Sequence, residues 1–153
     1  MNKKIKIIGI VVLISGILFA IIYFSTRNED NGTTMTEELK IEVLQEGEGE
    51  EVKNNDYVAA HYVGFLEDGT KFDSSLDREQ AFVFQIGKGE VIKGWDMGIL
   101  GMKRGEIRRL TIPSNLAYGE TGAGSGLIPA NATLTFIVEL VDFYSQESQE
   151  TQE

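Results

Sequence analysis

The stretch that decides the fold is GKGEVIKGWD, residues 87–96, which contains the only tryptophan of the chain, Trp95. KFDSS lies before it at residues 71–75, and AYG follows it at residues 117–119. Together these glycine-punctuated segments supply a tryptophan, an aspartate, a tyrosine and several aliphatic or phenylalanine side chains. This inventory predicts an apolar pocket with very few polar groups, and such a pocket needs no nucleophile to do useful chemistry.

The residues that follow this stretch predict one short helix. Trp95, Ile99 and Met102 recur with the spacing of one helical face, so we expect a helix over residues 94–102. Segments with alternating or β-rich composition surround it, namely residues 39–44, 57–65, 81–86, 106–112 and 133–144. Turn signals such as EDG at 67–69 separate them and favour an antiparallel sheet. One amphipathic helix against such a sheet predicts an α+β domain with Trp95 on the concave side.

Composition excludes several classes of function. From Ser25 onward the chain has 11 Lys and Arg against 24 Asp and Glu, a balance of 11 − 24 = −13, which argues against binding of nucleic acid or anionic lipid by the globular part. The absence of cysteine excludes disulfides, thiol redox chemistry and thiolate zinc sites. With a single histidine as well, the sequence predicts no metal site and no cofactor.

Residues 7–24, IIGIVVLISGILFAIIYF, form an uncharged apolar run. At about 1.5 Å per residue, a helix of this length approaches the roughly 30 Å of a bilayer core. We therefore predict a transmembrane signal anchor, the alternative being a cleaved signal peptide, whose apolar region is usually shorter. Lys3, Lys4 and Lys6 lie in a short segment, residues 1–6, that the positive-inside rule places in the cytoplasm. The rest of the chain is then expected outside the cytoplasm, as a single-pass membrane protein.

The remaining organisation follows from composition. Residues 25–38 are polar and acidic and predict a linker, and residues 145–153, SQESQETQE, predict a disordered polar tail. The folded domain is expected between them, over residues 39–144.

These segments resemble the FKBP-type peptidyl-prolyl cis-trans isomerases, a family that binds macrolide immunosuppressants. The matching text is HYVGFLEDGTKFDSS at 61–75, FVFQIG at 82–87, VIKGW at 91–95, GM at 101–102, AYG at 117–119, LIP at 127–129 and ATLTFIVEL at 132–140. The match covers nearly the whole of residues 39–144. It implies the family's fold, a five-stranded antiparallel sheet wrapped around one short helix, in agreement with the periodicity.

The resemblance also implies the site. It assigns the catalytic pocket to Tyr62, Phe72, Asp73, Trp95, Tyr118 and Phe136, and the binding of substrate or macrolide to Phe82, Val91, Ile92, Leu127 and Ile128. Trp95 is expected at the pocket floor, while the Ile92 N–H and the Tyr118 hydroxyl are expected to donate hydrogen bonds to substrate carbonyls. The loop at residues 119–127, GETGAGSGL, is longer and richer in glycine than the family version, which predicts weaker binding of extended ligands.

Three functions are compatible with these residues. The leading one is a membrane-tethered prolyl isomerase that acts on proline-containing polypeptides after export and assists their folding. The alternative is a non-catalytic binding or chaperone module that uses the same pocket. A hydrolase with His61, Asp73 and either Ser74 or Ser75 is the weakest, because His61 lies inside an alternating strand, where a structural role is favoured.

Overall fold

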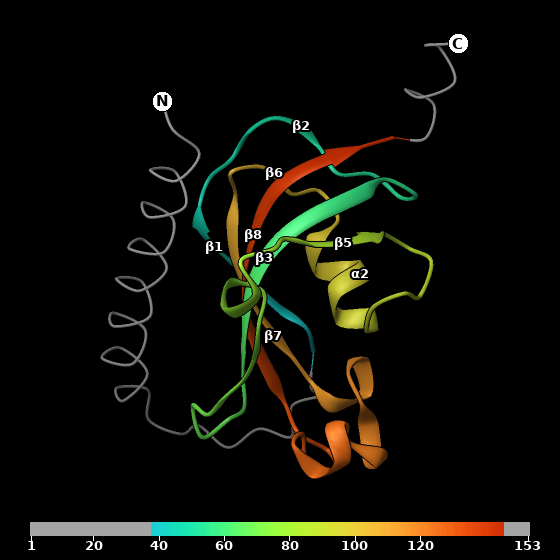
Figure 1. Ribbon diagram of the computed structural model, residues 1–153. Coiled ribbons are helices and arrows are strands. Elements are labelled where there is room, and N and C mark those ends of the chain that lie inside the picture. The colour runs from blue at the N-terminus through green and yellow to red at the C-terminus, as the bar shows by residue number, and fades with distance from the viewer. Residues whose placement is uncertain (1–37, 146–153) are drawn as a thin grey trace. The chain divides into compact units, whose positions relative to one another are not determined.

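A computed structural model describes residues 38–145, which form a curved antiparallel sheet around one helix (Figure 1). Its elements are β1 (Lys40–Gln45), β2 (Glu48–Glu51), β3 (Tyr57–Phe65), β4 (Lys71–Ser74), β5 (Phe82–Gln85), α2 (Lys93–Ile99), β6 (Lys103–Arg104), β7 (Ile107–Ile112) and β8 (Leu134–Tyr144). Short 3-10 turns lie at Leu76–Arg78, Ser114–Leu116, Gly119–Thr121 and Gly124–Gly126. The five expected strands are present within one residue of their predicted ends, and the α+β class is confirmed.

The main sheet has the strand order β1-β7-β8-β3-β4, with β5 also paired to β3. β3 is therefore the strand that both short strands share: β4 pairs with its end at Val63–Phe65, and β5 pairs with its beginning at Tyr57–Ala60. The expected count of five strands was too low, because β4 has only four residues and no clear alternation. β2 and β6 form a separate two-stranded ribbon that was not expected.

Helix α2 packs its predicted face against the sheet. Trp95, Ile99 and Met102 are 4%, 0% and 0% exposed, and they join the main core cluster with residues of β3, β5, β7 and β8. The absence of a side chain at Gly98 permits this contact, since a Cβ there would lie 2.8 Å from Leu110 Cδ1. The helix ends at Ile99 and not at Met102, because Leu100 is extended and Gly101 has a φ of +77°.

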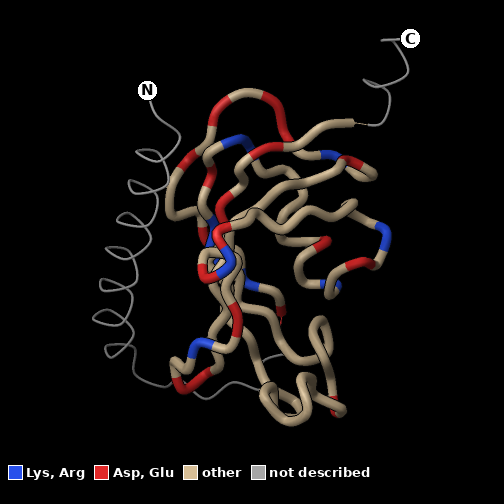
Figure 2. Tube along the Cα trace, in the orientation of Figure 1, with Lys and Arg blue, Asp and Glu red and all other residues tan. Residues whose placement is uncertain are grey.

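Lys and Arg positions alternate with Asp and Glu positions along the strands and turns of the domain and are not gathered in one segment (Figure 2). Between residues 38 and 145, no helix is long and apolar enough to cross a membrane. The predicted transmembrane helix at residues 7–24, the cytoplasmic segment at 1–6, nearly all of the linker and the tail beyond residue 145 lie outside the described residues.

Candidate active site

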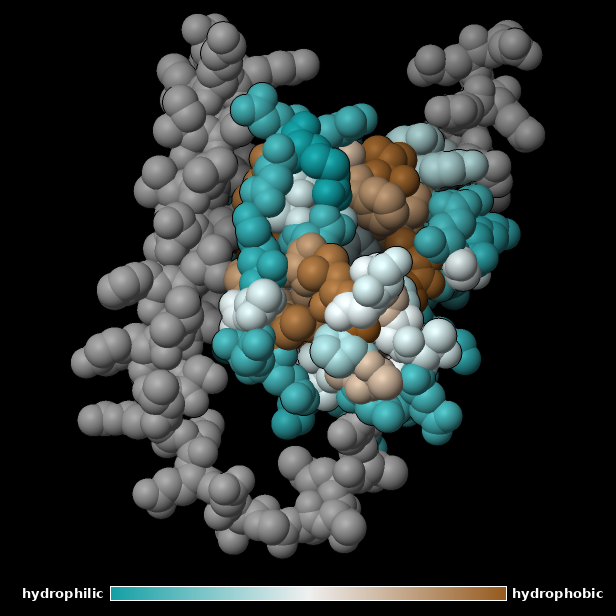
Figure 3. Space-filling view, turned by 60° about the horizontal axis from the view of Figure 1, so that its bottom comes forward, coloured by the Kyte–Doolittle hydropathy of each residue, from teal (hydrophilic) through white to brown (hydrophobic). Residues whose placement is uncertain are grey.

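A cavity of about 150 Å³ opens between α2, β3, β4, β5 and the loop after β7. It is lined by Tyr62, Phe72, Asp73, Phe82, Glu90, Val91, Ile92, Trp95, Tyr118 and Phe136. All of these except Glu90 belong to the residues that the sequence assigned to the site. Figure 3 shows apolar side chains gathered together on the surface of the domain, with hydrophilic residues around them.

Edge-to-face aromatic contacts build the floor of the cavity. The ring centroid of Trp95 lies 5.0 Å from that of Tyr62 and 5.3 Å from that of Phe136, with the ring planes nearly perpendicular. Phe72 packs on Phe136 in the same way, at 5.5 Å. A Cβ at Gly64 would lie 2.7 Å from the Phe72 ring, so a glycine at this point of β3 is what lets the aromatic wall close. Such pairs stabilise by about 0.5–1.5 kcal/mol each beyond the area they bury.

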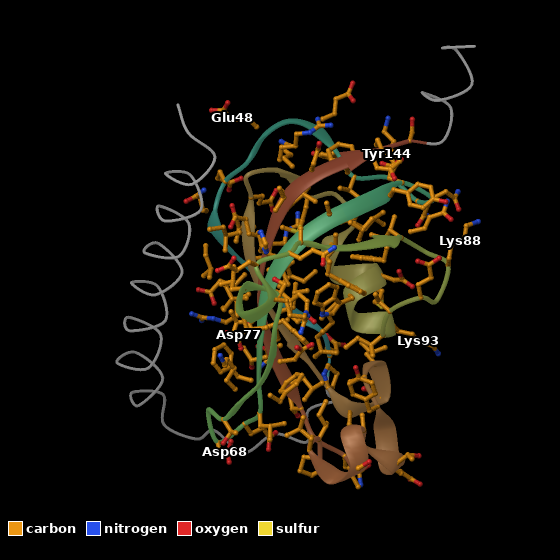
Figure 4. The ribbon with its side chains drawn as sticks, in the orientation of Figure 1. Glu48, Asp68, Asp77, Lys88, Lys93 and Tyr144 are labelled. Atoms are coloured by element: carbon orange, nitrogen blue, oxygen red, sulfur yellow. The ribbon has the colours of Figure 1, made fainter. Side chains whose placement is uncertain are left out.

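Three polar side chains form a closed network at one wall. The Tyr62 hydroxyl donates a hydrogen bond to Asp73 Oδ2, and Arg78 donates from Nη1 to Asp73 Oδ1 at 2.6 Å and from Nη2 to the Tyr62 oxygen at 2.9 Å. The Ser74 N–H also donates to Asp73 Oδ1, at 2.8 Å. Arg78 lies on the 3-10 turn after β4, beside Asp77, whose carboxylate bonds Lys71 at 2.8 Å (Figure 4).

This network sets the protonation states of the wall. Burial raises the pKa of Tyr62, and its bond to Asp73 raises it further, to about 12. Burial acts to raise the pKa of Asp73 as well, but the bonds from Tyr62, Arg78 and Ser74 outweigh it and lower the pKa below its ordinary value. The pKa of Tyr118 is raised by burial and by the charge of Asp73. At neutral pH the cavity therefore presents two neutral phenols and one ionised aspartate.

Two residues that line the cavity carry a hydrogen-bond donor without a partner in the described part of the chain. Ile92 is the N-cap of α2, and its carbonyl accepts from the N–H groups of Trp95 and Asp96, while its own N–H makes no hydrogen bond within residues 38–145. The Tyr118 hydroxyl is also unpaired over this range, and the residue is 40% exposed. Both are free to donate to carbonyl oxygens of a bound polypeptide.

Two of the predicted binding residues lie elsewhere. Leu127 is 53% exposed and does not line the cavity. Ile128 is buried in the core, where its N–H and C=O both bond the main chain of Ala123 at 3.0 Å. Sequence reasoning missed Glu90 and Arg78. The only signal for Arg78 was an arginine five residues after Asp73, since arginine often binds carboxylates through strong charge-assisted hydrogen bonds.

The structure does not assemble a hydrolytic triad around His61. His61 Nδ1 lies 3.1 Å from Ser75 Oγ, but Ser75 is fully buried and its Oγ accepts the Tyr62 N–H at 2.8 Å. Asp73, the expected third member, bonds Tyr62 and Arg78 instead. Burial lowers the pKa of His61. A substrate cannot reach the buried Ser75, so the contact between His61 and Ser75 is a structural one that joins β3 to the turn after β4.

Comparisons with known proteins agree with this geometry. Residues 48–141 match the family model described as FKBP-type peptidyl-prolyl cis-trans isomerase. An FK506-binding protein of Neisseria meningitidis serogroup A is 57% identical over 106 residues, which cover 69% of this chain and 96% of that protein. The human peptidyl-prolyl cis-trans isomerase FKBP2 is 58% identical over 89 residues, covering 58% of this chain and 62% of that protein.

A solved structure gives the same result in three dimensions. The crystal structure of AtFKBP13 superposes with a TM-score of 0.65 at 42% identity, over 69% of this chain and 93% of that one. The family match spans more than half of the chain, and the residues that it covers include the whole cavity lining. The chain belongs to the FKBP-type peptidyl-prolyl cis-trans isomerases.

Proposed function

We propose that this chain catalyses rotation about X–Pro bonds in polypeptides that fold after export, while residues 7–24 hold it at the membrane. The observation that carries the catalytic part is the cavity itself: a site lined mainly by aromatic and aliphatic side chains, with two unpaired donors at Ile92 and Tyr118. The location rests on the charge and hydropathy of residues 1–24.

The chemistry of the reaction fits such a cavity. Resonance holds the amide behind a barrier of about 18–20 kcal/mol, and uncatalysed exchange at proline takes tens to hundreds of seconds. In the twisted state the resonance is lost and the carbonyl is less dipolar, so an apolar surrounding favours this state over the planar amide. Each tenfold acceleration requires only about 1.4 kcal/mol of such preference.

The groups that line the cavity have different roles in the proposed reaction. Trp95 and the phenylalanines of the wall enclose the proline ring and exclude water. The Ile92 N–H and the Tyr118 hydroxyl anchor carbonyl groups on either side, so that rotation is confined to the C–N bond. Asp73 supplies a fixed negative charge that Arg78 keeps ionised. None of these roles needs a proton to move.

Several relatives are named FK506-binding proteins, and we propose that the same cavity binds FK506. The loop at residues 119–127 carries positive φ values at Gly119, Gly122, Gly124, Ser125 and Gly126. Ordering such a loop against a large ligand costs conformational entropy, so the affinity is expected to be lower than in relatives with a compact loop.

The experiment is a refolding assay on a substrate whose slow phase is set by an X–Pro bond. Substoichiometric amounts of the chain should accelerate that phase, and FK506 should abolish the acceleration. An effect that saturates at one chain per substrate, with no turnover, would instead identify the non-catalytic binding module. A higher yield of refolded substrate, with no change in the rate of the slow phase, would also identify a non-catalytic binding module.

A further inference from the structure

β5 is an edge strand with one open main-chain position. It pairs with β3 on one side only, with Phe84 opposite Val58 and Val83 opposite Ala59. In an antiparallel pair, alternate residues turn their N–H and C=O groups toward the partner strand. The Ile86 N–H donates to the Asp56 carbonyl beside β3 at 3.0 Å. Gln85, and with it Val83 two residues earlier, must therefore face away from β3.

Gln85 and Val83 differ in what meets them on that open side. The Gln85 N–H donates to a carboxylate oxygen of Glu90 at 2.9 Å, so a side chain closes this position. The main chain of Val83 makes no hydrogen bond outward to any residue between 38 and 145, and its side chain is 55% exposed. Exposed edges are usually blocked, because they offer a template for another strand. Here the edge is blocked at Gln85 and left open at Val83.

The open position borders a second concavity next to the cavity of the active site. This concavity, of about 310 Å³, is lined by Arg78, Gln80, Ala81, Phe82 and Val83. Phe82, which is 38% exposed, also lines the active-site cavity, so the two concavities adjoin at this residue. A polypeptide whose proline ring lies on Trp95 can reach the second concavity by passing over Phe82.

Arg78 adds hydrogen-bond donors at this place. A guanidinium has five N–H groups, and Arg78 uses one on Asp73 and one on Tyr62. Its side chain is 52% exposed and makes no further hydrogen bond within the described residues. The remaining donors are available to a main-chain carbonyl of a ligand in the second concavity.

We propose that this concavity is an extension subsite, in which residues flanking the substrate proline bind in an extended conformation along the edge of β5. The Val83 main chain pairs with the substrate backbone, and Arg78 donates to one of its carbonyls. This inference rests on the proposed isomerase function. Recognition through the main chain is tolerant of side-chain sequence, as suits an enzyme that acts on many unfolded chains.

The test compares substrate lengths on the full-length chain. A proline tetrapeptide serves as the reference, and two further peptides extend it by several residues on the amino or on the carboxyl side. Extension on one of these sides should raise kcat/KM by about three- to tenfold, the effect of one or two net hydrogen bonds. Equal values for all three peptides would overturn the subsite and leave the isomerase function standing. Failure to isomerise any of them would overturn the isomerase function itself.

Val83→Pro is the matched variant, because it removes an N–H that faces away from β3, and proline is tolerated at such positions of an edge strand. The ratio of kcat/KM for the long and the short peptide should fall to about one, while Val83→Thr, which keeps the N–H and the β-branched shape, should preserve it. As a readout that needs no variant, the Val83 amide resonance of the wild-type chain should shift with the long peptide and not with the tetrapeptide. An unchanged resonance at saturation would contradict the pairing.

Discussion

Arg78 Nη1 lies 2.6 Å from Asp73 Oδ1, and this ion pair holds the charged carboxylate at the wall of the aromatic cavity. Because the pKa of Asp73 is lowered, the residue is ionised at neutral pH and cannot supply a proton to an amide nitrogen. The pair thus argues for catalysis by environment and positioning.

Loss of the aromatic wall should cost more activity than loss of the carboxylate. Phe72→Ala opens the cavity to water and should lower kcat/KM by roughly 10- to 100-fold. Asp73→Asn keeps the shape and should lower it by about tenfold or less, the effect of a net hydrogen bond or two. Phe65→Ala, in β3 but on the opposite face from Tyr62, is the control and should leave kcat/KM unchanged. A larger loss for Asp73→Asn than for Phe72→Ala would contradict the desolvation mechanism.

The rate should be nearly independent of pH between about 6 and 8. The pKa of Tyr62 is about 12, that of Tyr118 is raised, and that of Asp73 is lowered. None of these groups changes charge in this window, and His61 does not line the cavity. The measurement is kcat/KM against pH with a substrate that does not itself titrate. A bell-shaped profile that disappears in His61→Ala, at unchanged stability, would revive acid–base chemistry.

Glu139 should be a source of instability at neutral pH. It is 9% exposed, its Oε2 has no hydrogen-bond partner among the described residues, and burial raises its pKa. For a carboxyl group with a raised folded pKa, the free energy of unfolding falls as pH rises from the unfolded pKa, about 4.3, through the folded one. Glu139→Gln should therefore raise the free energy of unfolding at pH 7 by about 1 kcal/mol.

The gain from Glu139→Gln should vanish at about pH 3, which lies well below the unfolded pKa, so that the wild-type carboxyl is protonated in both states. Denaturant unfolding at the two pH values checks this. The exposed Glu48 provides the control (Figure 4), since Glu48→Gln should change stability little at either pH. A gain of equal size at both pH values would show that burial of charge is not the cause.

Trp95 should report directly on ligand binding. It is the only tryptophan, it lies at the cavity floor, and its indole Nε1 has no partner within residues 38–145. Titration with FK506 should shift the fluorescence of Trp95. An unchanged spectrum at saturating FK506 would contradict the position of Trp95 at the cavity floor. Trp95→Phe loses no hydrogen bond and keeps an aromatic platform, so it should weaken FK506 binding less than Trp95→Leu does.

The proposed topology can be checked on intact cells. Lys3, Lys4 and Lys6 with the apolar run at residues 7–24 predict a domain outside the cytoplasm. Protease added to spheroplasts should digest the domain, and the chain should stay with membranes after a carbonate wash. Recovery in the soluble fraction with a new amino terminus near Ser25 would identify a cleaved signal peptide instead.

Local periodicity was enough to predict the helix face and the long strands. Trp95, Ile99 and Met102 share a face because helical geometry repeats every 3.6 residues or so, whatever the surroundings. The long strand β3 alternates in burial over its first six residues, and β8 is rich in β-branched and aromatic residues, so the ends of both were predicted within one residue. The resemblance then assigned residues from distant segments to one site, and nine of them do line one cavity.

Tertiary structure alone decided the features that depend on contacts between short segments. β4 is too short to carry a period, and it exists because β3 offers it hydrogen bonds at Val63–Phe65. Ile128 is apolar, as a pocket residue would be, yet its main-chain pairing with Ala123 places it in the core and not in the cavity lining. Arg78 meets Asp73 and Tyr62 only because the loop after β4 folds back over β3. Each of these contacts joins residues that neither the helical nor the strand repeat brings onto one face, so it leaves no mark on the local sequence pattern.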